Sequence, residues 1–444
     1  YQVNFTFPLE ADFAGDPESL LHQLLRSQPG GYAALIETPD RAIVSVSPEL
    51  FFRLDGDTLT CRPMKGTRRR GVTRSHTRAL ADELRAMGAA AVAPDRGSVL
   101  FSGDLRTVYD VNLRLRTAMR VLVPLVRGEV KSRKSLYELA ASVAWEEVIA
   151  DGQTLAVEVV GRHRAFRNTT FAGQVVKDAA VDRLRAKRGR RPNVDRENPD
   201  IRVHLRLVEK GATTLSLDSS GEPLSHRGYR PRGGPAPLAE TLAAGILLLA
   251  GYDGSEPLLD PMCGTGTFAV EAALIATGTP PGLHREFAFE RWPVHKSLTF
   301  EEVQHEASHG HREAPQPIVA RDRAERSIRS TQRNLKAAWM DTWVELEQRD
   351  ALDLLLPWGS GGVIVANPPY GKRVSDVEKL FGLYRRFGDS LKKQATGATA
   401  WILAGEPRLA KVIGLKPSRR IPLFNGPIEC RLLKFEMYEG SKKR

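Results

Sequence analysis

Cysteine is scarce in this sequence of 444 residues, and its scarcity excludes two kinds of structural support. The three cysteines, Cys61, Cys263 and Cys430, lie far apart and are odd in number. Neither a disulfide framework nor a zinc site built on cysteine is therefore indicated. Long apolar runs are also lacking: no stretch approaches the ~20 residues that span a bilayer, and no signal peptide precedes Tyr1. We expect a cytoplasmic protein that holds no metal.

Basic residues outnumber acidic residues, and this charge balance indicates the kind of partner that the protein binds. Lysine and arginine total 65 against 53 aspartates and glutamates, the formal net charge is +12, and the isoelectric point is about 9.7. This balance favours a polyanionic partner, with nucleic acid as the first candidate. A basic soluble protein without such a partner would have the same composition. The length predicts two or three domains.

The sequence divides into three zones, and the first two differ in the secondary structure that their patterns predict. Residues 1–77 contain short alternating runs and an Asp-Gly turn, which predict a β-rich fragment. Residues 78–219 combine helical and strand patterns in an α+β arrangement. Helical spacing covers 104–125, a strand is expected at 154–161, and Lys210-Gly211 marks the turn of a hairpin.

The third zone, residues 220–444, alternates strands with helices. Helices are expected at 267–277, 323–338 and 376–394, each between apolar strand candidates. Such alternation is typical of a doubly wound, mostly parallel, Rossmann-like α/β sheet. The domain limits we predict are therefore 1–77, 78–219 and 220–444.

A glycine-rich turn opens this zone, within LLDPMCGTGTFAVEAALIA. Gly264 and Gly266 remove side chains where a ligand approaches the backbone, and Asp260 ends the preceding strand. Asp322 and Asp350 end the next two strand candidates. One acid at a strand end is commonly a solvated loop residue, but three on successive strands of one sheet indicate a ligand site at their carboxyl ends. Asp260 is placed for a cationic amine, Asp322 for ribose hydroxyls and Asp350 for an adenine amino group.

The segment VIVANPPY ends a fourth strand in Asn367, Pro368, Pro369 and Tyr370. The exocyclic amine of a base is a poor nucleophile because its lone pair is delocalised into the ring. The Asn367 side-chain carbonyl and the Pro368 backbone carbonyl can each accept one N–H, which would orient that lone pair. Tyr370 offers a ring for stacking the base.

These motifs together resemble the class I S-adenosylmethionine-dependent methyltransferases that methylate amino groups. More closely, residues 78–438 are similar to the bacterial 23S ribosomal RNA guanine-N2 methyltransferases of the L type, through LSLDSSGEPLSHRGYRPRGGPAPLAETLAAGILLLAGY and PLFNGPIECRLLKFEMY. The resemblance implies methyl transfer from S-adenosylmethionine to guanine N2 in large-subunit rRNA, without DNA or membrane partners. The cofactor-binding candidates are Asp260, Pro261, Cys263, Gly264, Gly266, Thr267, Asp322, Asp350, Pro237, Glu240 and Thr241.

The middle zone resembles the THUMP domain of the same family, an RNA-binding module, through RPNVDRENPDIRVHLRL and RNTTFAGQVVKDAAVDRLR. A basic run is commonly a solvated surface, but beside a THUMP domain phosphate contact gains weight. The RNA-binding candidates are Arg167, Lys177, Lys187, Arg188, Arg190 and Arg191.

The front zone resembles a different family. YQVNFTFPL and VSPELFFRLDGDTLTCRPMKGTRRRG are similar to chorismate-binding enzymes, especially aminodeoxychorismate synthase component I. The resemblance implies a nucleophilic role for Lys65. The metal-binding glutamates and product site of that family lie in a part that does not follow here, so we expect an inactive fragment.

Several alternatives stay open from the sequence. A tRNA guanine-N2 methyltransferase with a THUMP domain has similar motifs, and a chorismate-utilising enzyme is a rival of another class. His305, His309 and His311 have metal-ligand spacing, but a solvated helix end is favoured. Trp292, Trp339 and Trp343 are expected in the core. Neither the modified nucleotide nor the oligomeric state follows from the sequence.

Overall fold

The chain forms two compact units, Tyr1–Arg70 and Gly71–Arg444, each taken by itself below. The computed structural model describes residues 32–38, 41–47, 53–55, 58–60, 74–95, 98–166, 168–195, 197–231, 238–370 and 374–438. In the first unit, β1 (Tyr32–Thr38) pairs antiparallel with β2 (Arg41–Ser47). β3 (Arg53–Asp55) pairs antiparallel with β4 (Thr58–Thr60), and the residues 56–57 between them lie outside the described part of the chain. These hairpins agree with the expected β-rich character of the front zone.

The second unit begins with a small α+β segment. Its elements are α2 (Arg74–Ala86), β5 (Ala90–Asp95), β6 (Ser98–Ser102) and α3 (Leu105–Arg114). β5 and β6 form a hairpin, and α2 packs against both strands.

The helix expected over 104–125 is wrong in its second half. Asp104 caps α3 by accepting from the Thr107 amide at 2.8 Å, but the chain leaves the helix at Leu115 and becomes β7 (Leu122–Gly128). β7 is the edge strand of a sheet, where Pro124 is tolerated because an edge strand needs fewer N–H donors. Strand pairing with β10 therefore prevails over local helical periodicity.

A four-stranded sheet organises residues 122–218, in the order β7-β10-β9-β8. β8 and β9 are parallel, and β9 and β10 form the predicted antiparallel hairpin. Helices α4 and α6 pack together, and α6 covers β8. The bounds are β8 (Leu155–Gly161), β9 (Ile201–Leu207), β10 (Thr213–Asp218), α4 (Arg133–Ala141), α5 (Trp145–Val148) and α6 (Thr169–Arg188).

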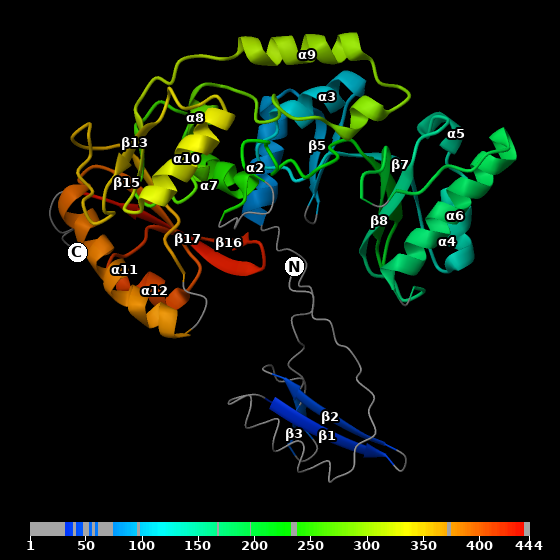
Figure 1. The fold of residues 1–444 in the computed structure, drawn as a ribbon, viewed down its shortest axis with the longest axis horizontal. Helices are drawn as coiled ribbons and strands as arrows, with labels where there is room; N and C mark the ends of the chain where they lie inside the picture. The colour runs from blue at the N-terminus through cyan, green and yellow to red at the C-terminus, as the bar shows by residue number, and fades with distance from the viewer. Residues whose placement is uncertain are drawn as a thin grey trace. The chain divides into compact units, whose positions relative to one another are not determined.

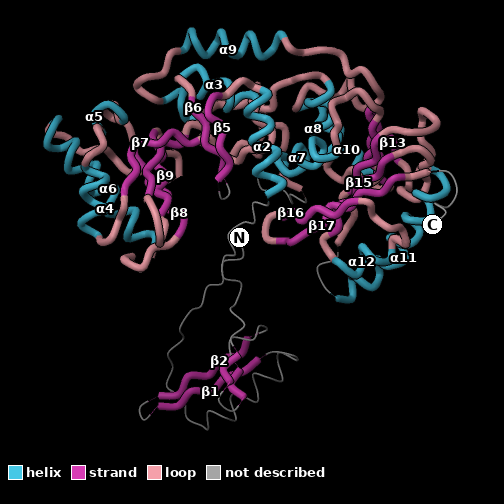
Figure 2. The backbone as a smooth tube through the Cα atoms, turned by 180° about the vertical axis from the view of Figure 1, so that it is seen from behind, coloured by secondary structure: helices cyan, strands magenta, loops and turns pink. Residues whose placement is uncertain are grey.

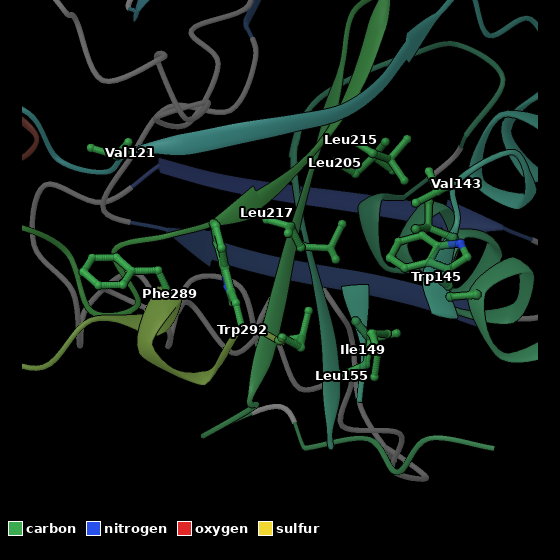
Figure 3. Packing of buried hydrophobic residues seen from close by; sticks show 14 of the residues in the cluster. Val121, Val143, Trp145, Ile149, Leu155, Leu205, Leu215, Leu217, Phe289 and Trp292 are labelled. Carbon is green, nitrogen blue, oxygen red and sulfur yellow. The ribbon is translucent and has the colours of Figure 1, made fainter. Parts of the chain in front are cut away.

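Figure 3 shows part of the hydrophobic core beneath this sheet, including Trp145, Phe289 and Trp292. Trp145 is fully buried and donates its indole N–H to the Ala140 carbonyl at 2.8 Å. Phe289 lies in the short 3₁₀ helix η1 (Ala288–Arg291), which comes from the third zone of the sequence. Residues far apart in the chain thus share one core, which ties the four-stranded sheet to the segment that follows α8.

A seven-stranded sheet forms the third zone, in the order β13-β12-β11-β14-β15-β17-β16. The five neighbouring strands β13, β12, β11, β14 and β15 are parallel to one another. β17 pairs antiparallel with both β15 and β16 (Figure 1). The bounds are β11 (Leu258–Asp260), β12 (Ile318–Asp322), β13 (Glu345–Gln348), β14 (Val363–Ala366), β15 (Thr399–Ala404), β16 (Arg419–Asn425) and β17 (Ile428–Glu436). The central strands are buried on both faces, as a doubly wound sheet requires.

Helices cover both faces of this sheet and form two separate cores. One core contains residues of α7 (Glu240–Ala250), α8 (Thr267–Ala276) and α10 (Glu325–Ala337). The other contains residues of α11 (Val374–Gln394) and α12 (Pro407–Val412), which lie side by side in both views (Figures 1 and 2). The remaining helix, α9 (Ser297–His309), packs along α3. None of the helices in the described part of the chain is long and apolar enough to cross a membrane.

A buried polar network joins the small α+β segment to α8. The Arg227 guanidinium lies 3.3 Å from Glu271 of α8 and donates to the carbonyls of Leu224 and Arg116 at 2.7 and 2.5 Å. Arg116 in turn donates to the carbonyls of Leu274 and Thr279, at 3.0 and 2.9 Å. Arg227 and Glu271 are almost fully buried, and burial of a charge is tolerated only with such partners.

Candidate cofactor and target site

The site lies where the sheet reverses its direction of growth. From β11 the chain adds β12 and then β13 on one side, and afterwards β14 and β15 on the other. In open α/β sheets, ligands bind at the carboxyl ends of the strands at such a switch point. The glycine turn follows β11 and Asn367 follows β14, so the two predicted motifs flank this point.

The two glycines of the turn have different tasks. Gly264 has φ +58°, and a Cβ atom there would meet nothing within 4 Å, so its backbone faces open space. Gly266 has φ +78°, and a Cβ atom there would lie 2.4 Å from the Thr331 methyl group. Gly264 leaves room for a ligand, whereas Gly266 permits close packing of α10 on the turn.

Two residues of α10 hold the turn, and sequence reasoning missed both. Asn334 donates its amide to the Thr265 carbonyl at 2.8 Å, and the Thr331 hydroxyl donates to the Gly264 carbonyl at 3.2 Å. Both side chains are buried. The signal that could have found them is polar residues at i and i+3 on the helix face toward the sheet.

The structure brings two of the three predicted acids together around the turn. Asp260 is 1% exposed and accepts from the Met262 amide at 3.2 Å. Burial raises the pKa of Asp260 to about 8, and the nearby Asp322 carboxylate adds to the rise. Asp322 accepts from the amides of Gly264 and Ala324, at 3.0 and 2.9 Å. Asp322 therefore fixes the turn as well as facing the site.

The third acid is placed differently. Asp350 lies two residues beyond the end of β13, is exposed, and accepts from the Leu352 amide at 2.9 Å. Beneath it, buried Arg321 binds Glu347 at 2.6 Å and the Leu355 carbonyl at 2.9 Å. This pairing fixes the two ends of the segment that carries Asp350.

Other predicted cofactor residues make contacts that are mainly structural. Cys263 is buried, its sulfur lies 3.5 Å from the Thr331 hydroxyl, and burial raises the pKa of its thiol. Pro261 is buried beside it, and Thr267 begins α8.

At the start of α7, Glu240 pairs with Arg230 at 2.6 Å, and burial raises the pKa of Glu240. The Thr241 hydroxyl contacts the Met119 sulfur at 3.4 Å, so its bond is not to the glycine turn. Pro237 lies outside the described residues.

The Asn-Pro-Pro-Tyr motif is closed on itself in this structure. The Tyr370 hydroxyl donates to the Asn367 side-chain carbonyl, which is the acceptor assigned to a substrate amine. A methyl group placed on Gly405 would lie 2.6 Å from the Tyr370 ring, so the ring packs against the end of β15. Tyr384 of α11 donates to the Pro369 carbonyl at 3.1 Å. Pro368, which follows Asn367 in the chain, is buried. The stacking role of Tyr370 stays a prediction, and it requires the ring to move.

Two of the six predicted RNA-binding residues contact other groups of the protein. Arg188 donates to the carbonyls of Ile149 and Glu146 and pairs with Asp151. Lys177 pairs with Asp178 at 2.8 Å. Lys187, Arg190 and Arg191 are exposed, while Arg167 lies outside the described residues. Phosphate contact by this run stays a prediction, with three exposed cations to support it.

The histidine and tryptophan candidates differ in their contacts and in their burial. The rings of His305 and His309 lie 3.9 Å apart, and His311 bonds to the Thr279 hydroxyl at 2.9 Å instead of joining them. Trp292 is buried as expected. The expectation that Trp339 lies in the core is wrong. Trp339, which follows α10, is 71% exposed, and its ring stacks on the ring of His284.

Comparison with known proteins agrees with this architecture. The family described as "RMKL-like, methyltransferase domain" matches residues 227–434, the THUMP domain matches 130–218, and the "RlmL ferredoxin-like domain" matches 77–122. A Synechocystis sp. protein named as an RNA methyltransferase is 35% identical over 381 residues, covering 85% of this chain and 98% of that protein. The chain belongs to the RMKL-like methyltransferases that carry a THUMP domain. The predicted class I methyltransferase fold with a preceding THUMP domain is confirmed.

Two further relatives of this RMKL-like methyltransferase bear on its ligand and substrate. The ribosomal RNA large subunit methyltransferase K/L of Syntrophotalea carbinolica is 40% identical over 371 residues, which cover 81% of this chain and 52% of that protein. The chain thus spans about half the length of this relative. SMU.472, described as "a putative methyltransferase", was crystallised as a complex with S-adenosylhomocysteine. Its structure matches this chain with a TM-score of 0.74 at 26% identity, and the match covers 83% of this chain and 97% of SMU.472.

S-adenosylmethionine, the cofactor predicted for such a methyltransferase, fits the residues present. Burial raises the pKa of Asp260 and the Asp322 carboxylate adds to the rise, so a cationic ligand would favour the ionised form of Asp260. The Thr265 hydroxyl in the turn is buried without a hydrogen-bond partner in the described structure. The backbone at Gly264 is open to a ligand. A cationic, hydroxyl-bearing cofactor satisfies each of these features.

The chorismate binding enzyme family matches residues 1–87, which contain the first unit and α2 of the second. Lys65, the residue expected to act as nucleophile in that family, lies outside the described residues. The predicted inactivity of this fragment remains to be tested.

Proposed function

We propose that the chain transfers a methyl group from S-adenosylmethionine to the exocyclic N2 of a guanosine in 23S rRNA, in the cytoplasm. The observation that carries the proposal is the placement of Asn367 at the end of β14, next to the strand that carries the glycine turn. An amine acceptor and a cofactor cradle then share one edge of one sheet. The names of the K/L relatives support rRNA as the substrate.

The residues of the chain would act mainly by orientation. S-adenosylmethionine supplies an electrophilic methyl group when bound. Asp322 accepts hydroxyl donors, Asp260 offers a carboxylate to the amine, and α10 keeps the turn rigid through Thr331 and Asn334. The carbonyls of Asn367 and Pro368 accept the two N–H groups of the guanine amine and direct its lone pair. Preorganised acceptors of this kind need no reorganisation during reaction.

Substrate binding would involve one change at this motif. The Tyr370 hydroxyl, which donates to the Asn367 carbonyl, would give way to the guanine amine. Tyr370 would then be free to stack on the target base, in keeping with the role expected from its motif. One residue thus covers the acceptor in the absence of substrate and holds the base in its presence.

A tRNA guanine-N2 methyltransferase is the alternative within the same class, since the THUMP match does not distinguish the two RNAs. The experiment that separates them measures transfer of tritiated methyl from S-adenosylmethionine to purified 23S rRNA and to a tRNA pool, followed by nucleoside analysis. We expect N2-methylguanosine in rRNA alone. Label in tRNA alone, or in methyladenosine, would contradict the proposal.

The chorismate match of the front unit defines a second assay. We expect no consumption of chorismate when the intact chain is incubated with ammonia and magnesium. Turnover that Lys65→Ala abolishes would show instead that the front unit is an active enzyme.

A further inference from the structure

A group of exposed cations lies at the outer edge of the seven-stranded sheet. Lys411 is on α12, Lys416 is on the connection to β16, and Arg419 and Arg420 begin β16. We call these four residues the α12–β16 basic surface. All four are exposed, and none forms an ion pair with another described residue. The sequence from 407 to 428 contains no acidic residue, so nothing local neutralises them.

Some exposed cations elsewhere in the second unit form ion pairs. Arg78, Lys131, Lys134 and Arg329 are between 73% and 85% exposed, and each lies within 4 Å of a carboxylate. On the neighbouring strand β17, Arg431 pairs with Glu429, and Lys434 pairs with Glu436. The α12–β16 basic surface is therefore a local excess of positive charge, as is the exposed group Lys187, Arg190 and Arg191.

This surface is joined to the Asn-Pro-Pro-Tyr motif, the proposed target site, by a single strand. β16 runs from Arg419 to Asn425, and Asn425 lies beside Tyr370. Five residue steps from Arg420 to Asn425 correspond to roughly 17 Å of strand. A nucleic acid strand whose base enters this site would therefore carry its next phosphates within reach of the basic surface.

The surface is also held rigidly. A Cβ atom on Gly388 of α11 would lie 1.9 Å from the Ile413 carbonyl, so α11 and the end of α12 are in backbone contact. The Ser418 amide donates to the Lys434 carbonyl at 2.9 Å, which anchors the start of β16. Cations on a backbone held in this way lose less backbone freedom on binding than cations on a mobile loop.

Edge protection is the competing explanation. Charged residues and proline on an edge strand prevent pairing with other chains, and β16 carries Arg419, Arg420 and Pro422. Lys411 and Lys416 lie off this strand, however, and edge protection does not require them.

We propose that the α12–β16 basic surface binds the sugar-phosphate backbone of the RNA whose guanine enters the Asn367 site. The choice of RNA rests on the proposed function, while the preference for a polyanion rests on the four unpaired cations. The contact is sequence-independent: it positions the strand and leaves recognition of the base to the target site.

The test compares two charge-matched variants of the full chain. One carries Lys411→Gln, Lys416→Gln, Arg419→Gln and Arg420→Gln. The control carries the same change at the ion-paired positions Arg78, Lys131, Lys134 and Arg329. Affinity for protein-free 23S rRNA is measured over a range of salt concentrations. Each lost phosphate contact should reduce the slope of log affinity against log salt by about 0.7, so the first variant should lose about 2 to 3 in slope while the control stays near the wild type.

Kinetics give a second readout. Because the four residues do not touch the reacting atoms, their replacement should raise KM for RNA and leave kcat and S-adenosylmethionine affinity unchanged. If the slope and KM of the first variant match those of the control, the cations serve edge protection alone and the proposal is overturned. If the wild type binds RNA with the expected slope but forms no N2-methylguanosine, the proposed function fails while the surface stands.

Discussion

The two halves of the seven-stranded sheet hold their polar groups differently. Beside β11 and β12, the glycine turn is bonded by side chains of α10, and Asp322 is fixed by two backbone amides. Beside β14 and β15, the Asn367 side-chain carbonyl accepts from Tyr370 of its own motif. We call the first half the cofactor half and the second the target half, after the roles proposed for them. The cofactor half is held by partners far away in sequence, whereas the target half is closed by a contact within its own motif.

The largest expected effect lies in the target half. Asn367→Ala removes one amine acceptor and should lower kcat by roughly 10²–10³, the loss typical of one preorganised hydrogen-bonding group. Cofactor affinity, measured by calorimetry, should be unchanged because Asn367 bonds to no residue of the glycine turn. Asn367→Asp is the matched control, since it keeps an acceptor oxygen. Near-normal turnover of the alanine variant would refute the assigned role.

The cofactor half should respond in binding rather than in turnover. Asp322→Ala removes an acceptor and also frees the Gly264 amide, and it should weaken S-adenosylmethionine binding by about 1.5–3 kcal/mol. Calorimetry with S-adenosylhomocysteine provides the same comparison without reaction. An unchanged dissociation constant would place the ribose acceptor elsewhere.

Asp260 gives the same half a pH dependence. Its pKa is raised to about 8 in the folded protein, against about 3.9 in an unfolded chain. The stability associated with its protonated form is present in full below about pH 4 and is lost as the pH rises toward 8. The wild type without cofactor should lose thermal stability across this window, and Asp260→Asn should flatten the curve. Equal pH profiles of the two proteins would rule out this titration.

The smallest effect is expected at the contact that closes the target half. Tyr370→Phe keeps the ring but removes the hydroxyl that occupies the Asn367 acceptor, so KM for RNA should fall about 2- to 10-fold, as for loss of one hydrogen bond. Tyr384→Phe loses a bond to the Pro369 carbonyl instead and should not lower KM. A higher KM for Tyr370→Phe would mean that the hydroxyl assists the substrate.

Features that depend on residues close together in the sequence could be predicted, whereas features that depend on residues far apart in the sequence could not. The strand ends that carry Asp260 and Asp322, the two glycines and the hairpin of β9 and β10 are specified locally, by alternation and turn residues, and were predicted correctly. The strand β7 was taken for helix because its pairing partner, β10, is about 90 residues away.

Side-chain partnerships across the fold were beyond the sequence. Thr331 and Asn334 act on a turn more than 60 residues earlier, and only the packing of α10 shows it. The Tyr370 hydroxyl and the Asn367 carbonyl are three residues apart, yet their bond depends on the backbone that two prolines impose. The exposure of Trp339 likewise depends on where α10 ends against its neighbours.

The Arg116 contacts have a consequence for how the second unit melts. Separating residues 77–122 from α8 would break the bonds of the Arg116 guanidinium to the Leu274 and Thr279 carbonyls and the bond of the Arg116 carbonyl to Arg227, and the loss of hydrogen bonds to charged groups, about 1.5–3 kcal/mol each, resists partial opening. Heating should therefore give one cooperative transition for these two parts, without an intermediate in which the catalytic sheet persists alone. A protease would accordingly find no stable fragment to release at this junction, and any laboratory chimera that exchanges one part must carry the other with it.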